Sequence, residues 1–521
     1  MSSDFETARE SIERMVRNHP ENVARILANH GGKIETRAAV LTPVDTGLLM
    51  RATQYHVASI DAYGHGEVSL TIENRMVYAH YQHERKLNHP NKPTARDHFI
   101  SIPFEKEIPA IISDAVYERN LAVEVDLGVK LSFVDQSSDL VAQTAITKLV
   151  QAGDTTMDIF TIGTYCAVDP AISGCYLNLA NLEYIDLSKH YWSQDYNNMM
   201  TFTSENKQYL ATSPAALSLF RLTYLTIFNR DLFNERKIPD LYETVANGDW
   251  TLEYQLSLIE DTWVDTDGDG KNSKDDFYGF ITGTCISVDA YCVASDIHLV
   301  IRDEDGYLAY NSDKVESLVD MAEKVNALYQ NQGTYAFKGQ LEDDIGLHYI
   351  MEKFSEKQGL MATTQFLSIE SYIGPLSEMS YGIVPMPKLS KAQANYQTYV
   401  QDQVTSFGIS AAIKNESRQS MLSAVMESIA YHSNEIVRPA YYESALSLRF
   451  MQDPQSRDIL GTMFETIAFD YTYVTDIHSI RATLRSMLPA KTLAIASRVQ
   501  GWERSVSKIL EKDNAALDEL P

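Results

Sequence analysis

The chain has 521 residues, of which 44 are Lys or Arg and 71 are Asp or Glu, so its formal net charge at neutral pH is -27. This length allows about three domains and excludes a single small module, and 44% hydrophobic with 22% charged residues exclude a disordered or fibrous chain. The acidic balance excludes nucleic-acid binding through a broad basic face, because phosphate groups would be repelled.

Charge and residue usage change near residue 110. Up to Ala110 the chain carries 13 basic and 14 acidic residues, whereas the remainder carries 31 and 57. Eight of the 13 His residues lie in the first part, and all four Trp and all four Cys lie in the second. We therefore expect two differently composed pieces, residues 1–108 and 109–521.

The first piece predicts a small α+β module. Apolar residues recur at helical spacing within 5–15 and 23–38, and the period then changes to two. The stretch GEVSLTIE (66–73) alternates as a half-buried strand does, and TQYHVASI (53–60) can pair with it across DAYGHG as a hairpin.

Three segments of this module carry a resemblance: TPVDTGLL, VYAHYQHER and HPNKPTARDHFI. Together they resemble the minor capsid or head-to-tail connector proteins of tailed bacteriophages. The resemblance implies an assembly module that packs against copies of itself and performs no chemistry.

The second piece alternates strands with longer helices, which is typical of α/β folds. LGVKLSFVD (127–135) and MDIFTIGT (157–164) read as strands on either side of a helix in SDLVAQTAITKLVQAGD (138–154). Such units build parallel sheets whose ligand sites lie at the carboxyl ends of strands. The loop Gly163-Thr164-Tyr165 follows one of these strands directly.

Several segments resemble the extracytoplasmic solute-binding proteins that serve sugar-type ABC importers of Gram-positive bacteria. In the order of that family, they are DAVYERNLAVEVDLGVKLSFVD, AGDTTMDIFTIGT, YIDLSKHYW, TIFNRDLFNERKIPDLYETVANGDWTLEYQL, DTDGDGKNSKDDFYGF, YGIVPMPKLSKAQANYQTYVQDQ and PAYYESALSLRFMQDPQSRDIL.

The resemblance implies a fold of two discontinuous α/β lobes, like the type II periplasmic binding proteins. It places the crossings between lobes near 208–230 and 381–410, with a ligand bound between the lobes. The implied function is binding of a sugar or oligosaccharide for the permease subunits of an ABC importer, with cleft closure and no catalysis. It also implies an extracytoplasmic location, although the chain as written shows no signal peptide, which would leave it cytoplasmic.

The match begins abruptly near Asp114, so the usual first strand of the family is missing. That strand would lie in the middle of the first lobe's sheet, and its absence should leave a gap or unpaired sheet edges. We expect that the N-terminal hairpin does not fill this gap, because its alternating pattern suits a one-sided antiparallel sheet.

Sugar recognition needs flat apolar faces for the ring and fixed polar groups for the hydroxyls. Aromatic residues beside polar ones in loops are therefore the candidates, each of which can equally be an ordinary core or surface residue. Candidate ligand contacts are Gly163, Thr164, Tyr165, Tyr191, Trp192, Asp402 and Tyr441. Trp250 reads as structural, since it precedes an expected helix cap at Thr251.

Residues 265–276 have the spacing of a calcium-binding loop, with carboxylates at positions 1, 3 and 5 and a glycine at position 6. A short Asp stands at position 12, where a bidentate Glu is usual. No cofactor is required for the implied function. The acidic loop either binds a structural Ca²⁺ weakly or is an acidic surface turn that holds no metal. Its candidate ligands are Asp265, Asp267, Asp269, Lys271 and Asp276.

The alternatives are a phage virion protein with a C-terminal binding appendage and, less favoured, a glycosidase. The chain lacks GxSxG, HExxH, GxGxxG and phosphate-loop motifs, and acidic pairs are expected by chance among 71 carboxylates. It also has no run of 18 apolar residues that could span a membrane. Without CxxC or Cys/His clusters, the four cysteines read as buried or half-buried free thiols.

Overall fold

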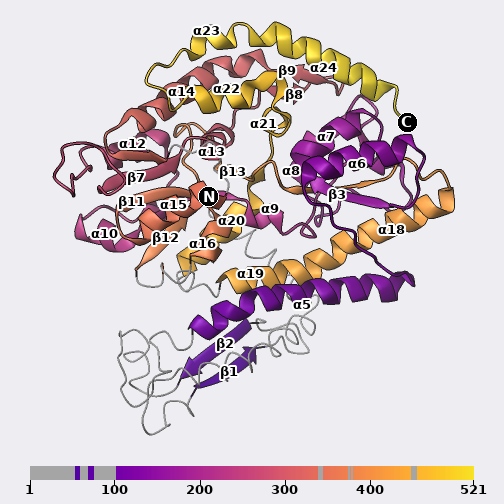
Figure 1. The fold of residues 1–521 in the computed structure, drawn as a ribbon, viewed down its shortest axis with the longest axis horizontal. Coiled ribbons are helices and arrows are strands. Elements are labelled where there is room, and N and C mark those ends of the chain that lie inside the picture. Colours follow the sequence, from indigo (N-terminus) through magenta and orange to yellow (C-terminus); the bar gives the residue numbers. More distant parts are fainter. Residues whose placement is uncertain are drawn as a thin grey trace. The chain divides into compact units, whose positions relative to one another are not determined.

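The structure is a computed structural model (Figure 1) that describes residues 53–58, 69–74, 101–337, 344–372, 376, 379–446 and 454–521. The chain divides into two compact units. The large unit comprises Phe133–Glu427 and Ile459–Pro521, and the small unit takes in Ser2–Ser132 and Ser428–Asp458. The boundary expected at residue 108 falls inside a single helix of the small unit, α5 (Ser101–Leu127).

The small unit contains the expected hairpin. Strands β1 (Thr53–Ala58) and β2 (Ser69–Asn74) pair antiparallel with each other. Neither pairs with any other strand in the described ranges, so the hairpin does not enter the sheets of the large unit, as the alternating pattern predicts. The expected helices within 5–15 and 23–38 lie outside the described residues.

Two later segments of the chain join α5 in the small unit. A π-helical turn, Ser433–Val437, follows α18 (Glu416–His432) and leads into α19 (Arg438–Leu446). Arg119 of α5 donates from Nη1 to Ser433 Oγ at 2.8 Å. Burial lowers the pKa of Arg119 to about 10, so it stays a cation at neutral pH.

A five-stranded sheet forms the core of one half of the large unit, in the order β10-β7-β11-β6-β12. Its central strands are buried along their whole length, and the polar residues at the end of β11, Thr363 to Gln365, are buried with the apolar ones. Strands β10, β7 and β11 run parallel, whereas β6 is antiparallel to both of its neighbours. The strands are β6 (Tyr224–Asn229), β7 (Tyr278–Gly283), β10 (Thr334–Phe337), β11 (Gly359–Gln365) and β12 (Tyr381–Val384).

The helices between these strands are α10 (Arg230–Glu235), α11 (Leu241–Ala246), α12 (Leu252–Ile259), α13 (Ile286–Ala294), α14 (Val315–Gln330), α15 (Asp344–Ser355) and α16 (Phe366–Ser371). Thr251 caps α12, accepting a hydrogen bond from Tyr254 N, as predicted. Trp250 beside it is fully buried and donates from Nε1 to Pro385 O at 2.8 Å, which confirms a structural role.

The other half of the large unit contains a two-stranded sheet in which β3 (Ile159–Gly163) and β14 (Thr405–Ile409) run antiparallel. Helices α6 (Asp139–Gln151) and α7 (Thr164–Ile172) flank β3 in sequence and pack together. Further elements around this pair are a 3-10 turn at Leu179–Asn181, α8 (Gln194–Met199), β4 (Thr201–Phe202) and β5 (Lys207–Gln208). The expected α/β class is confirmed.

The strand predicted at 127–135 does not form. α5 ends at Leu127, and residues 129–136 have no regular structure. Phe133 and Val134 are 68% and 60% exposed, and on the following helix Leu140 is 62% exposed. A strand needs a neighbour for its backbone groups, and β3 has only β14 as a partner in the described chain. This agrees with the gap expected from the missing first strand.

Hydrogen exchange checks this gap. We expect most amides of residues 129–135 to exchange at nearly the rate of unstructured peptide, because the segment pairs with no strand of the described chain. Leu131, whose N–H donates to Glu124 Oε1 at 2.9 Å, should be the slower exception. The amides of β3 that face β14 should exchange more slowly by orders of magnitude, measured by mass spectrometry on peptides of the full chain. Equal protection of the two segments would contradict the unpaired state of 129–135.

Two segments carry the chain between the sheets. In the first, which runs from residue 211 into β6, Ala211 forms a bridge with Phe407 of β14. In the second, which runs from β12 into β14, Val400 forms a bridge with Thr223. The two crossing segments therefore lie side by side in the large unit.

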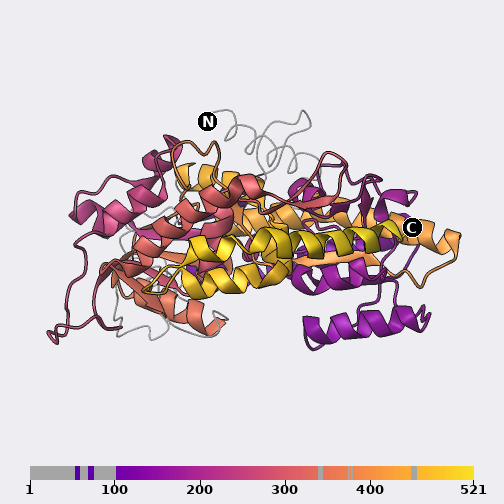
Figure 2. The same ribbon diagram turned by 90° about the horizontal axis from the view of Figure 1, so that it is seen from above.

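The C-terminal helices contact both halves of the large unit. Helix α24, yellow in Figure 2, contacts α7 beside β3, whereas α23 contacts α14, which packs against β10 of the five-stranded sheet. Lys207 of β5 donates to the carbonyl oxygens at the end of α24, including Asp518 O at 3.1 Å. The elements here are β8 (Val300–Arg302), β9 (Leu308–Tyr310), β13 (Thr398–Tyr399), β15 (Ile467–Ala468), α20 (Pro454–Glu465), α21 (Tyr471–Thr475), α22 (Ile480–Met487), α23 (Ile495–Val499) and α24 (Trp502–Asp518).

All four cysteines are free, three of them buried and Cys285 partly so, which confirms the expectation of free thiols. Among the helices of the described ranges, none combines the length and hydropathy that a membrane span requires.

Candidate functional site

The loop after β3 meets the second crossing segment. Thr164 donates from both its backbone N and its Oγ1 to Val404 O, at 2.9 and 2.8 Å. Tyr165 N donates to Asp402 O at 3.1 Å. The structure thus brings together four of the residues named from the sequence, since Gly163 immediately precedes this pair.

Gly163 is required by a close approach. Its N–H donates to Asp139 Oδ1 at 3.0 Å, and a Cβ at this position would lie 2.7 Å from Asp139 Oδ2. Any larger residue would push the carboxylate away from the backbone N–H that it binds. The start of α6 is therefore fixed against the loop that carries Thr164 and Tyr165.

A chain of buried hydroxyl groups lies behind this loop. Thr164 Oγ1 lies 2.6 Å from Ser406 Oγ, which in turn lies 2.5 Å from Tyr196 Oη. Burial raises the pKa of Tyr196 to about 12, so its hydroxyl stays protonated and can act as a donor. The network joins α7, β14 and α8, and no local sequence pattern predicts it.

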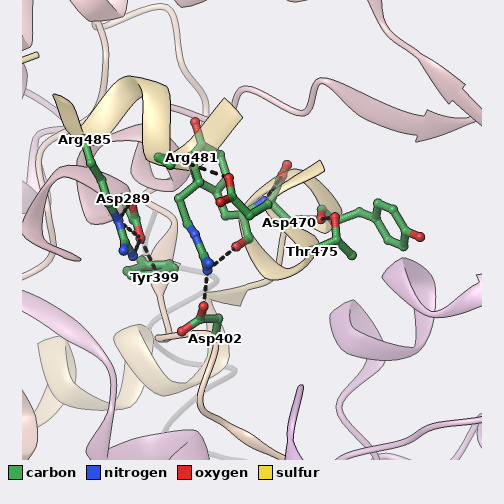
Figure 3. Close-up of polar contacts among 11 residues, drawn as sticks. Asp289, Tyr399, Asp402, Asp470, Thr475, Arg481 and Arg485 are labelled. Atoms are coloured by element: carbon green, nitrogen blue, oxygen red, sulfur yellow. Dashed lines mark hydrogen bonds and ion pairs between the residues drawn. The ribbon is translucent and has the colours of Figure 1, made fainter. Parts of the chain in front are cut away.

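Two arginines of α22 bind buried carboxylates in the large unit (Figure 3). Arg481 bonds through Nη1 to Asp402 and also to Tyr473 O, the latter at 2.7 Å. Arg485 holds Asp289 of α13 in a forked pair, with Nε 2.9 Å from Oδ1 and Nη2 on the other oxygen. Such paired forks fix both partners in orientation.

Burial shifts the pKa values of the two carboxyl groups that these arginines bind. Burial raises the pKa of the fully enclosed Asp289 to about 6, although the bond to Arg485 opposes the shift. Burial likewise raises the pKa of Asp402 above its ordinary value, and Arg481 opposes it. Because Arg481 Nε is buried and has no hydrogen-bond partner within the described residues, this group still has a donor to offer beside Asp402.

Sequence reasoning did not single out Arg481, Arg485 or Asp289. The two arginines are four residues apart, and this spacing places both on one face of a helix. That spacing could have pointed to a shared surface. Their carboxylate partners lie 79 and 196 residues away in sequence, so no local signal could have named them.

Tyr191 and Trp192 have a different environment from the Gly163–Tyr165 loop. Trp192 donates from Nε1 to Glu427 Oε2 at 3.0 Å, and Tyr191 Oη bonds to the other oxygen of the same carboxylate. Trp192 is only 2% exposed, so its ring face is covered by protein. Tyr441 lies in α19 of the small unit, where it too is buried. Ligand contact by these three residues stays a prediction.

The acidic loop at 265–276 brings its first three carboxylates together, as its spacing predicts. Carboxylate oxygens of Asp265, Asp267 and Asp269 lie within 4.8 Å of one another. Asp276, by contrast, is buried and accepts hydrogen bonds from Thr266 N and the Ser273 backbone N–H at 2.9 and 2.8 Å. The position 12 carboxylate is therefore already engaged within the loop.

Lys271 stands at position 7 of the loop. In calcium loops of this type the residue at position 7 binds the ion through its backbone carbonyl, so the charged side chain of Lys271 would not be a ligand. Its N–H donates to Asp269 Oδ1 at 2.7 Å. Calcium binding stays a prediction.

Calcium should raise the thermal unfolding midpoint of the full chain at millimolar concentration, because a cation relieves the repulsion among three clustered carboxylates. Mg²⁺ should do so less, since it loses its water reluctantly. Differential scanning fluorimetry of the chain and of Asp265→Asn checks this. Asp313→Asn, which changes a carboxylate outside the loop, is the control, and an equal response of all three proteins to Ca²⁺ would contradict the site.

No protein-family model and no curated protein matches the sequence. Among solved structures, a sugar transporter protein from Rhizobium etli in an open conformation is similar at 16% identity and a TM-score of 0.49, covering 78% of this chain and 96% of that one. A cyclo/maltodextrin-binding protein complexed with maltotetraose is similar at 13% identity and a TM-score of 0.47, covering 78% and 93%. MalX from Streptococcus pneumoniae in complex with maltopentaose is similar at 14% identity and a TM-score of 0.44, covering 77% of this chain and 96% of that one. These values describe architecture and assign no ligand.

Proposed function

We propose that this chain binds a carbohydrate solute where the loop after β3 meets the crossing segment that carries Asp402. The observation that supports this proposal is the meeting of Thr164, Tyr165 and Asp402, which lie on segments about 240 residues apart. A ring with hydroxyl groups needs an aromatic face and fixed donors and acceptors. Tyr165 can offer the face, and Asp402 with Arg481 can offer the polar groups.

The charge arrangement favours a neutral ligand. Each of the two arginines is neutralised by a carboxylate, so the cluster offers directional hydrogen bonds rather than a strong field. A sugar hydroxyl can accept from the free Nε–H of Arg481 and donate to a carboxylate oxygen. No bond is made or broken in this proposal, and the ligand leaves unchanged.

The quoted sequence segments extend the proposal to a transport role. By that resemblance, the protein would deliver its sugar to the permease subunits of an ABC importer on the outer side of the membrane. Hinge bending along the two crossing segments would enclose the ligand, driven by its higher affinity for the closed form.

A sugar panel tests the proposed function. The unfolding midpoint of the full chain should rise with at least one mono- or oligosaccharide, since a ligand at 100 times its Kd adds about 2.7 kcal/mol. Tyr165→Ala and Asp402→Asn should each weaken binding at least tenfold by isothermal titration calorimetry. The half-exposed Tyr184, changed to Ala, is the matched control. Unchanged affinity in Tyr165→Ala and Asp402→Asn would overturn this placement of the site.

A further inference from the structure

The large unit contains a second place that a small ligand fits. A cavity of about 220 Å³ lies between α8, the β8–β9 hairpin and residues 469–471. Its lining shares no residue with the loop after β3 or with the arginine pairs of α22. Its volume is below the roughly 300–1,000 Å³ of pockets for drug-sized ligands. It therefore suits a single ring and not a chain of rings.

Three polar side chains in the lining have bonding capacity left. Asp195 accepts from Phe469 N through Oδ2 at 2.7 Å, and its Oδ1 makes no hydrogen bond with the described residues. The side chains of Arg302 and Asn198 have no hydrogen-bond or ion-pair partner in the described part of the chain. Burial lowers the pKa of Arg302, as expected for a guanidinium without a carboxylate beside it.

The charge around the cavity disfavours an anionic ligand. His298, which also lines it, bonds to Asp470 at 2.7 Å and to Asp296 at 3.3 Å. These bonds raise the pKa of His298 to about 10, so the ring is a cation at neutral pH. The cations His298 and Arg302 are therefore outnumbered by three carboxylates, those of Asp195, Asp296 and Asp470. The whole chain carries a formal net charge of -27.

The remaining lining is apolar and partly aromatic. Met199, Val300 and Ile301 contribute aliphatic surface. Phe469 and Tyr471 also line the cavity, but each is only 4% exposed. An apolar lining together with an unpaired carboxylate oxygen, an amide and a guanidinium matches a molecule with one C–H face and a rim of hydroxyl groups. A hydroxyl can donate to Asp195 and accept from Arg302 without adding charge.

From this arrangement we infer that the cavity binds one neutral pyranose unit, as a site separate from the loop after β3. The inference does not rest on the proposed function, because it uses none of the residues placed in that site. Arg302 and Asp195 orient the hydroxyl rim, and the aliphatic side chains of the lining cover the C–H face of the ring.

Methyl α-D-glucopyranoside, galactopyranoside and mannopyranoside are the probes, titrated into the full chain and followed by ligand-observed saturation-transfer NMR and calorimetry. Asn198 lines the cavity, so Asn198→Trp should fill part of it, and because Asn198 is an exposed helix residue this variant should fold normally. Arg302→Leu should weaken binding of the preferred pyranoside at least tenfold, and Arg302→Lys should recover part of it. Circular dichroism checks the fold of each variant.

The variants separate this site from the proposed one. Binding that is lost in Asn198→Trp and retained in Asp402→Asn supports the cavity even if the proposed function fails. Pyranoside binding unchanged in both Asn198→Trp and Arg302→Leu, or no binding of any of the three probes to the wild-type chain, would overturn the inference while leaving oligosaccharide binding at Asp402 open to its own test.

Discussion

Replacing Arg485 with Met should destabilise the protein by about 3–5 kcal/mol at pH 7, because removing one partner of a buried pair leaves an uncompensated charge. Asp289 is that charge, and its side chain is fully buried. Its only other described polar contact is a long one, 3.5 Å, from Tyr399 Oη. Urea denaturation followed by circular dichroism measures the loss.

The pH dependence of this loss has a definite sign. Burial already raises the pKa of Asp289 from 3.8 to about 6, and without Arg485 it rises further. A raised carboxyl pKa means that the native state holds a proton that the unfolded chain releases, so stability falls as the pH rises through this window. The penalty of Arg485→Met should therefore be small near pH 4 and grow through pH 6 and above.

Two controls identify the cause. Arg498 is exposed and has no described side-chain partner, so Arg498→Met should change stability by less than about 0.5 kcal/mol. The double variant Asp289→Leu with Arg485→Met removes both charges and should recover much of the loss. A double variant as unstable as the single one would show that packing, and not the unpaired carboxylate, accounts for the effect.

Replacing Lys353 with Met should cost about 3 kcal/mol, since hydrogen bonds from a charged donor to buried acceptors are each worth about 1.5–3 kcal/mol. Lys353 of α15 is 6% exposed. Its Nζ donates to the carbonyls of Lys274 and Asp276, at 2.7 and 2.5 Å, and to the side chain of Gln358 at 2.8 Å. The same ammonium lies over the rings of Tyr278 and Tyr335.

The wild-type pH profile should show this lysine too. Burial lowers the pKa of Lys353 from 10.5 to about 8, so between these values the unfolded chain binds more protons than the native state. Wild-type stability should then rise with pH across this window relative to Lys353→Met. Lys508→Met, at an exposed position of α24, serves as the control. Parallel pH profiles for wild type and Lys353→Met would contradict the shifted titration.

Local pattern alone was enough for several elements. Alternation at 66–73 predicts the hairpin strand β2, and the apolar run at 157–164 predicts β3. The helix expected within 138–154 is α6, and its cap Ser138 accepts a hydrogen bond from Val141 N. These features depend on residues a few positions apart, so the sequence displays them directly.

The tertiary structure decided everything that depends on a distant partner. Residues 127–135 have the composition of a strand, but β3 pairs with β14 alone, and without a neighbour the segment stays irregular. In the same way, the four-residue spacing of Arg481 and Arg485 does not identify their partners, Asp402 and Asp289. A strand or a buried charge is stable only when another segment supplies hydrogen bonds or an opposite charge, and that supply is fixed by folding, not by local sequence.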